Sequence, residues 1–176
     1  MTMNPVRRAA TALLISGCLA TTASAADIRI GVAEALSGPA AQYGVSAKNG
    51  FMLAAEQINA KGGINGNRIT LVIEDEQGKK EEAINVFKKL AFQDKVLMIF
   101  GPTLSNSAFA ADPIANQAKL VIFGTSNTAN GITNIGPFVF RNSVMESDVL
   151  PYTIRAAVKR FNVRKVAVIY GNDDAF

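Results

Sequence analysis

The feature that most constrains the fold of this chain is the regular alternation of two kinds of apolar segment. One kind is a short, almost unbroken apolar run rich in β-branched residues, which is typical of a strand buried on both faces. Five such runs predict strands at residues 28–33, 69–73, 96–100, 120–123 and 166–170.

The second kind of segment repeats its apolar residues at helical spacing. Four of these segments predict amphipathic helices around residues 47–58, 83–91, 108–118 and 150–161. The alternating order predicts an α/β protein with a parallel sheet covered by helices on both faces. Because 49% of the residues are hydrophobic, the chain has enough apolar surface to form such a core.

Several classes of function are disfavoured by what the sequence lacks. Histidine is absent, which removes Ser-His-Asp and Cys-His catalysis and the commonest zinc ligand. The sequence also lacks the G-x-S-x-G motif of α/β-hydrolases. Without Arg7 and Arg8 of a predicted leader, the 18 basic residues become 16, against 14 acidic ones. This charge balance, together with the lack of a basic stripe, argues against a nucleic-acid partner. Because the usual catalytic residues and motifs are missing, we expect a binding protein that is not an enzyme.

The first 25 residues have the pattern of a signal peptide. Arg7-Arg8 form a positively charged n-region, residues 9–19 are apolar, and Ala23-Ser24-Ala25 is an A-x-A cleavage site. We therefore expect a periplasmic protein that begins near Ala26. The alternative is a lipoprotein, because residues 15–18 resemble a lipobox that would leave a lipidated Cys18 at the N-terminus.

An acidic run, Glu74-Asp75-Glu76, follows the second predicted strand. Three carboxylates suggest a metal site, but consecutive residues point in different directions. We therefore expect solvated side chains that brace the loop, and we assign no metal and no cofactor.

The loop after the third predicted strand, residues 101–107, contains small polar residues and leads directly into a helix. Parallel sheets bind ligands at the carboxyl ends of their strands, and a helix N-terminus offers unpaired N–H groups and a partial positive charge to an anion. Ser105 offers a hydroxyl and a backbone N–H to a carboxylate there. The alternative is that Ser105 or Asn106 only caps the helix.

The next edge loop, residues 124–130, is also rich in hydroxyl groups. A main-chain carbonyl of this loop and the Thr128 hydroxyl are suited to accept hydrogen bonds from an ammonium group. One loop for a carboxylate and one for an ammonium group describe an α-amino acid site, and the alternative is a polar surface loop. Tyr43, in the first edge loop, is either a wall of this pocket or a tyrosine packed on its own loop.

Five segments in this order carry a resemblance to a known family: "IRIGVAEALSGPAAQYG", "AAEQINAKGGINGNRITLVIEDEQGKKEEA", "FGPTLSNSAFA", "GTSNTA" and "VIYGNDDAF". Residues 27–176 resemble the substrate-binding proteins of branched-chain amino acid ABC transporters, which have a type I periplasmic binding fold. The resemblance implies two Rossmann-like lobes that close on the ligand by a hinge. It places lobe one at residues 26–142 and an incomplete start of lobe two at residues 143–176, so we expect an N-terminal fragment.

The resemblance also implies roles for individual residues. Ser105 matches a serine that binds the ligand carboxylate, Ser126 a main-chain carbonyl for the ammonium group, and Thr128 a threonine that contacts both. Tyr43 matches an aromatic of the side-chain pocket, and Phe176 falls where relatives have an aromatic of lobe two, often tyrosine. The full set of candidate ligand-binding residues is Tyr43, Leu104, Ser105, Ser126, Asn127, Thr128 and Phe176.

The partners implied by the resemblance are an amino acid ligand and the membrane permease of an ABC transporter. The acidic residue that completes the family's ammonium site lies beyond the end of this chain. Leu104 is bulkier than the residue some relatives have beside the serine. The alternative function is the ligand-binding domain of an amino acid or amide sensor, because receptors use the same fold.

Overall fold

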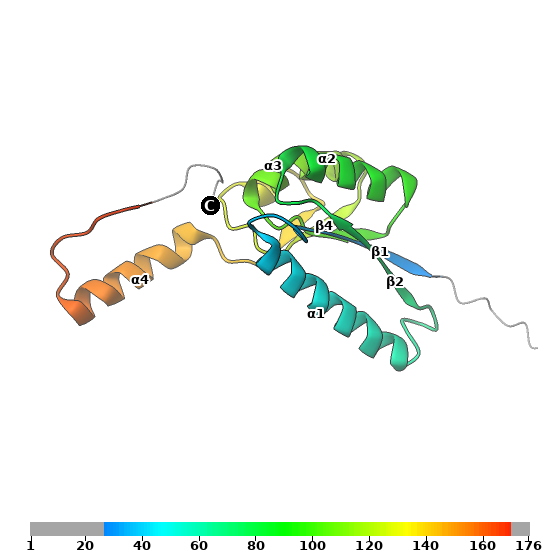
Figure 1. The fold of residues 1–176 in the computed structure, drawn as a ribbon, viewed down its shortest axis with the longest axis horizontal. Helices are drawn as coiled ribbons and strands as arrows, with labels where there is room; N and C mark the ends of the chain where they lie inside the picture. The colour runs from blue at the N-terminus through cyan, green and yellow to red at the C-terminus, as the bar shows by residue number, and fades with distance from the viewer. Residues whose placement is uncertain (1–26, 170–176) are drawn as a thin grey trace, which may run out of the picture.

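The computed structural model describes residues 27–169, which form a parallel sheet with helices on both faces (Figure 1). The strands are β1 (Ile28–Glu34), β2 (Ile69–Asp75), β3 (Met98–Phe100), β4 (Val121–Gly124) and β5 (Val139–Arg141). Their order across the sheet is β2-β1-β3-β4-β5, and every neighbouring pair is parallel. The predicted α/β fold is therefore confirmed.

The helices divide between the two faces of this sheet. The helical segments are α1 (Ala41–Ala60), α2 (Lys80–Lys88), a π-helical turn η1 (Lys89–Gln93), α3 (Ser105–Gln117), a 3-10 turn η2 (Ile132–Asn134) and α4 (Glu146–Phe161). Figure 1 shows α2 and α3 side by side on one face and α1 on the other. The strand–helix order forces this arrangement, since each connection between parallel strands crosses a face of the sheet.

The buried core lies between the sheet and the layer of α2 and α3. Its largest fully buried apolar side chains come from α2, η1, β3, β4 and η2: Phe87, Leu90, Ile99, Ile122 and Ile132. On the other face α1 buries only Gly44 and Ala55, although Phe51 stacks on Phe100 of β3 with ring centroids 4.4 Å apart. The sheet is thus well packed on one face and thinly covered on the other.

The fifth strand is the main error in the predicted elements. Residues 166–169 are not a strand, and Tyr170 lies outside the described residues. The fifth strand of the sheet is instead β5, at Val139–Arg141, a segment in which no strand was predicted. Its three residues follow Gly136-Pro137, and so short a run gives no periodic signal.

The four predicted helices are all present, but α4 differs from the other three in its packing. It buries none of its residues and extends away from the sheet (Figure 1). Within residues 27–169, no helix is both long and apolar enough to cross a membrane. The leader predicted at residues 1–25, Cys18 and Phe176 lie outside the described residues.

Candidate functional site

The turn between β3 and α3 brings the chain close to the end of β1. Gly101 has a φ of +117°, and a Cβ built on it would stand 1.9 Å from the carbonyl oxygen of Ala33. Only glycine fits so close an approach with this backbone conformation. The Gly-Pro pair that ends β3 therefore places the start of α3 directly beside the carboxyl end of β1.

Thr103 links this turn to β1 through a buried hydrogen-bond network. Its hydroxyl donates to Oε2 of Glu34 at 2.5 Å and accepts the N–H of Ala35 at 2.9 Å. The hydroxyl of Thr125, from the loop after β4, donates to the same carboxylate oxygen at 3.2 Å. Burial raises the pKa of Glu34 to about 7, although the hydrogen bonds from Thr103 and Thr125 act in the opposite direction.

The three residues of the acidic run have separate partners. Glu76 is buried, which raises its pKa, and it accepts hydrogen bonds from the Ser107 hydroxyl at 2.9 Å and the Thr103 N–H at 3.4 Å. Asp75 accepts the backbone N–H of Leu36 at 2.8 Å. The predicted loop-bracing role is confirmed, but the expectation of solvated side chains is wrong for Glu76, because hydroxyl and N–H donors replace water around it.

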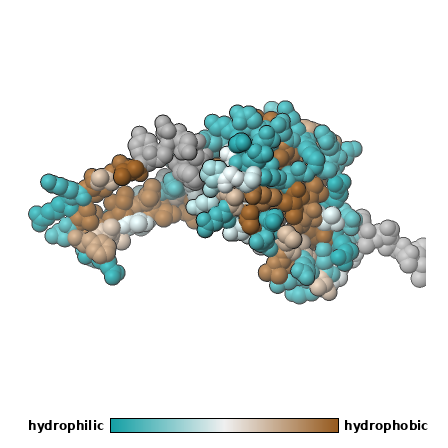
Figure 2. Space-filling view, viewed as in Figure 1, coloured by the Kyte–Doolittle hydropathy of each residue, from teal (hydrophilic) through white to brown (hydrophobic). Residues whose placement is uncertain are grey.

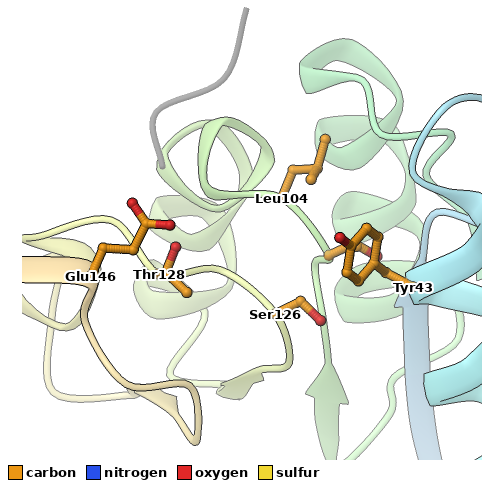
Figure 3. A pocket seen from close by; sticks show the side chains of 6 residues that line it. Tyr43, Leu104, Ser126, Thr128 and Glu146 are labelled. Atoms are coloured by element: carbon orange, nitrogen blue, oxygen red, sulfur yellow. The ribbon is translucent and has the colours of Figure 1, made fainter. Parts of the chain in front are cut away.

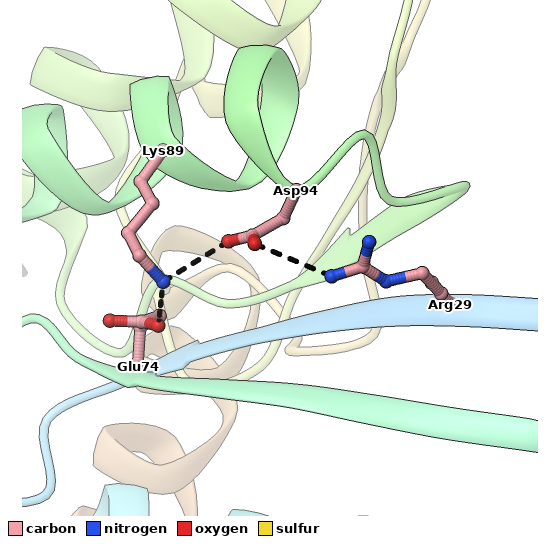
Figure 4. Close-up of polar contacts among 4 residues, drawn as sticks. All are labelled: Arg29, Glu74, Lys89 and Asp94. Atoms are coloured by element: carbon pink, nitrogen blue, oxygen red, sulfur yellow. Dashed lines mark hydrogen bonds and ion pairs between the residues drawn. The ribbon is translucent and has the colours of Figure 1, made fainter.

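Glu74, the first residue of this run, belongs to a chain of ion pairs that connects β2 with η1 and β1 (Figure 4). Lys89 pairs with Glu74 and, at 3.1 Å, with Asp94, which also pairs with Arg29 at 3.3 Å. The carboxylates raise the pKa of Lys89 through their hydrogen bonds. Within residues 27–169, no cluster of three or more metal-ligating side chains is present.

Ser105 is the first residue of α3 and is fully buried. Its hydroxyl oxygen accepts the backbone N–H groups of Thr128 and Ala129, each at 3.2 Å. The N-cap position is occupied by Leu104, without a side-chain capping bond. The alternative in which the Ser105 hydroxyl only caps its own helix is therefore wrong, since this hydroxyl joins α3 to the loop after β4.

Asn127 forms a second link between the two loops. Its side-chain amide donates to the carbonyl oxygen of Pro102 at 3.0 Å, and its main-chain carbonyl accepts a hydrogen bond from the Ser143 hydroxyl. The Asn127 side chain is fully buried. It therefore fixes the loops relative to each other from behind rather than facing a ligand.

A pocket of about 180 Å3 lies at this edge of the sheet (Figure 3). Its lining residues are Tyr43, Thr103, Leu104, Ser126, Thr128 and Glu146. Tyr43 from α1 stands on one side, with Thr128 and Glu146 on the other. The Thr128 hydroxyl oxygen is buried and has no partner among the described residues, which leaves it available to a bound molecule.

The pocket brings together four of the seven candidate residues, namely Tyr43, Leu104, Ser126 and Thr128. Ser105 and Asn127 lie behind its wall and do not line it. Sequence reasoning missed Thr103, although it belongs to the same polar turn as Ser105. It also missed Glu146, because a residue at the start of the fourth helix gives no local sign of being close to the loop after β4.

Open parallel α/β sheets bind ligands at the carboxyl edge, in pockets that combine mainly apolar surface with a few polar groups, and the pocket described above has this position and this kind of lining. The comparisons with known proteins agree with a ligand-binding role. A family model described as "Periplasmic binding protein" matches residues 27–176, and the chain belongs to this family. The predicted resemblance is therefore confirmed.

The relatives are binding proteins. The chain is 30% identical over 162 residues to a Leu/Ile/Val-binding protein of Escherichia coli K12, covering 89% of this chain and 44% of the relative. The chain thus spans less than half the length of this curated relative.

Two solved structures of similar fold contain bound ligands. The branched-chain amino acid transporter substrate binding protein LivJ of Streptococcus pneumoniae, in complex with isoleucine, aligns with a TM-score of 0.72 at 30% identity, over 77% of this chain and 39% of that one. A solute binding protein of Rhodopseudomonas palustris with 3,4-dihydroxy benzoic acid aligns with a TM-score of 0.62 at 25% identity, over 68% of this chain and 32% of that one.

Proposed function

We propose that this chain supplies the first lobe of a two-lobe, extracytoplasmic substrate-binding protein that captures an amino acid, branched-chain or related, for the permease of an ABC transporter. Lobe one corresponds to residues 26–142, and lobe two begins with residues 143–176. The proposal assigns capture and delivery but no catalytic step. The observation that carries it is the small pocket with Ser126 and Thr128 in its lining, beside the N-terminus of α3.

The pocket can hold an amino acid by its two charged ends. The first N–H groups of α3 favour a carboxylate, because they carry the partial positive charge of a helix N-terminus. Ser105, behind the pocket wall, accepts the N–H of Thr128 and so holds the neighbouring loop against this helix end. The main-chain carbonyl of Ser126 and the Thr128 hydroxyl accept hydrogen bonds from an ammonium group. Leu104 and Tyr43 provide apolar and aromatic surface for a hydrocarbon side chain.

The test is a thermal-shift and calorimetry panel on the full-length protein. Leucine, isoleucine and valine are compared with 4-hydroxybenzoate as an aromatic acid without an amine. A true ligand at a hundred times its Kd stabilises the protein by about 2.7 kcal/mol, which is easily measured as a rise in Tm. Binding of the benzoate alone, or of no amino acid, contradicts the proposal.

Ser105→Ala tests whether the binding takes place at this edge. The Ser105 hydroxyl lies behind the pocket wall and accepts the backbone N–H groups of Thr128 and Ala129, so its removal should displace Thr128 from its place in the pocket. Because a hydrogen bond contributes about 0.5–1.5 kcal/mol, we expect amino acid affinity to fall by up to about tenfold. The control is Ser107→Ala, which removes a buried hydroxyl from the same turn of α3 but one that contacts Glu76. Equal loss in both variants would mean that Ser105 acts only through the stability of α3.

A further inference from the structure

Glu34 joins the loops after β3 and β4, which line the pocket, to the end of β1. It is the last residue of this strand and is fully buried. Its oxygen Oε2 accepts hydrogen bonds from the Thr103 hydroxyl at 2.5 Å and from the Thr125 hydroxyl at 3.2 Å. Thr103 lines the pocket, and Thr125 directly precedes Ser126, which also lines it. A single carboxyl oxygen therefore holds both loops from behind the pocket.

The charged groups that neighbour Glu34 are carboxylates. Asp75 is its partner in the register of β1 and β2, but the Asp75 carboxylate binds the backbone N–H of Leu36. Glu76 reaches the turn after β3 and accepts the N–H of Thr103 at 3.4 Å. The loops after β3 and β4 contribute neutral hydroxyls to Glu34, and no ion pair within residues 27–169 includes Glu34 or Glu76. A negative charge on Glu34 is therefore not balanced by a cation in the described part of the chain.

The second oxygen of Glu34, Oε1, makes the charged form costly. It is buried and has no partner among the described residues, so no donor replaces the water that an ionised carboxylate loses there. Burial raises the pKa of Glu34 to about 7, and the charge of Glu76 adds to this effect, whereas the two hydroxyl donors oppose it. A small further cost of charge at this place is therefore enough to leave a proton on Glu34 at neutral pH.

A bound amino acid supplies such a cost. The proposed function places the ligand carboxylate at the N-terminus of α3, whose N-cap residue is Leu104. Thr103, the preceding residue, lines the pocket, while its hydroxyl and its N–H bind Glu34 and Glu76. The ligand carboxylate therefore stands across Thr103 from two buried carboxyl groups, and the ligand also displaces water from the pocket. Both changes raise the free energy of a negative charge on Glu34.

We infer that Glu34 is a positioning residue that takes up a proton when an amino acid fills the pocket, so that capture is tighter in neutral and mildly acidic solution than in alkaline solution. This inference rests on the proposed function and adds a regulation by pH to it. Between the pKa values of the empty and the filled protein, the filled protein holds a proton that the empty one has released, so affinity falls as the pH rises through this range. Below about pH 7 both forms hold the proton, and the affinity is constant.

The experiment measures leucine binding to the full-length protein by calorimetry from about pH 6 to about pH 8, on both sides of the pKa of Glu34. Leucine itself stays a zwitterion over this range. Titrations in phosphate and in imidazole buffer, which differ in their enthalpy of ionisation, give the number of protons taken up on binding. We expect the wild-type protein to take up part of a proton near pH 7 and above. Because a shift of one pKa unit corresponds to a factor of ten, its affinity should fall by up to about tenfold at the alkaline end.

Glu34→Gln keeps the size of the side chain and an oxygen that accepts both hydroxyls, but it cannot bind the proton. This variant should abolish the proton uptake and flatten the pH profile of the affinity. The matched control is Asp112→Asn, because burial also raises the pKa of Asp112, to about 8. Asp112 follows Ser105 by seven residues in α3, about 10 Å along the helix, and does not line the pocket. Its variant should therefore keep the proton uptake of the wild-type protein.

The wild-type titration is a test even where a variant does not fold, since leucine binding without proton uptake, or with proton release, overturns the inference. Uptake that persists in Glu34→Gln assigns the proton to another group, and uptake that disappears in Asp112→Asn assigns it to α3. Binding in Glu34→Gln that is weaker but equally dependent on pH means that Glu34 acts only through the structure of the loops. In all these cases the wild-type protein still binds leucine, so the proposed function stands, whereas a wild-type protein that binds no amino acid contradicts the proposed function itself.

Discussion

Two buried carboxyl groups, Glu34 and Glu76, stand behind the pocket on either side of Thr103. Glu34 is fully buried, and its second carboxylate oxygen, Oε1, has no partner among the described residues. Burial raises its pKa, and the nearby charge of Glu76 adds to the effect. The proton on Glu34 is therefore gained and lost close to neutral pH, while an exposed glutamate loses its proton well below it.

This shift predicts a pH-dependent stability. The pKa of Glu34 is about 7 in the folded protein, against an ordinary value of 4.5, so between these values the folded state holds the proton that the unfolded chain has lost. The free energy of unfolding therefore falls as the pH rises from about 4.5 to about 7, by roughly 3 kcal/mol. Below this window the contribution is fully retained. Glu34→Gln should flatten this part of the profile, measured by urea denaturation from pH 4.5 to pH 8.

The test of this prediction is the difference between the profiles of wild type and Glu34→Gln. A second carboxyl group, Asp112, is also buried, and burial raises its pKa to about 8. It lowers stability over a similar pH range, so a falling profile in the wild-type protein alone does not identify Glu34. Glu81→Gln, at an exposed position of α2, serves as the control. Profiles of Glu34→Gln and wild type that are parallel across the window would refute the assignment.

Site residues could be predicted from the sequence where a general rule applied to them. Polar residues that directly follow a buried strand lie at the ligand-binding edge, and this rule identified Thr128 and its loop, whereas Ser126 was singled out only by the family resemblance. No such rule reveals that Glu34 is buried. Its burial depends on Thr103 and Thr125, which come from distant parts of the chain and supply the donors it needs.

At the scale of elements, the sequence was most informative where a segment carried several apolar residues. The strands β1 to β4 and all four long helices could be predicted in this way. The strand β5 could not, because three residues are too few to establish a period and the sheet itself selects them through the pairing of Ile122 with Val139. The run at 166–170 has strand composition, but residues 166–169 have no sheet neighbour in the described part of the chain.

The position of α1 depends on a close approach between a glycine of this helix and the loop after β1. A Cβ built on Gly44 would stand 2.1 Å from the carbonyl oxygen of Ala35, whereas Gly50, in the same helix, has open space around it. The approach places the start of α1, and with it Tyr43, at the rim of the pocket. The same loop contains the donors that bind Asp75, so the whole rim shares one framework.

Two matched substitutions test this framework. Gly50→Ala should raise the free energy of unfolding by roughly 0.5–1 kcal/mol, because alanine favours the helix and nothing obstructs its methyl group. Gly44→Ala gains the same helical preference but must displace the backbone of Ala35, so we expect a net loss of stability. Denaturant unfolding of both variants measures the difference. Equal gains in the two variants would show that α1 can shift without cost.

At the scale of the whole molecule, apolar surface is unevenly covered. The face of the sheet under α2 and α3 encloses the core, whereas the α1 side has an apolar groove of about 250 Å3 that includes Ile30, Phe51 and Leu71. Figure 2 shows apolar residues at the surface both over this domain and along α4. A structure of this kind has exposed surface that favours association with other apolar surfaces.

Much of this exposed apolar surface lies on the helix α4. Ile154, Val158 and Phe161 lie on one side of the helix by their spacing, and their exposed fractions are 57%, 44% and 70%. We expect the 176-residue chain on its own to self-associate through this side, because an apolar helix face in water gains free energy by pairing. Sedimentation velocity over a range of protein concentrations measures the association.

Substitution on the two sides of α4 separates this mechanism from general insolubility. Ile154→Ser, Val158→Ser and Phe161→Ser together should shift the 176-residue chain toward monomer at a given concentration. The control combines Thr153→Ser, Ala156→Ser and Arg160→Ser, which place serines on the opposite side of the same helix and should leave association unchanged. If both triple variants associate as strongly as the wild-type chain, the contact lies elsewhere, and the apolar groove beside α1 becomes the surface to test. If both dissolve equally well, the loss of helix propensity rather than the loss of an apolar face explains the result.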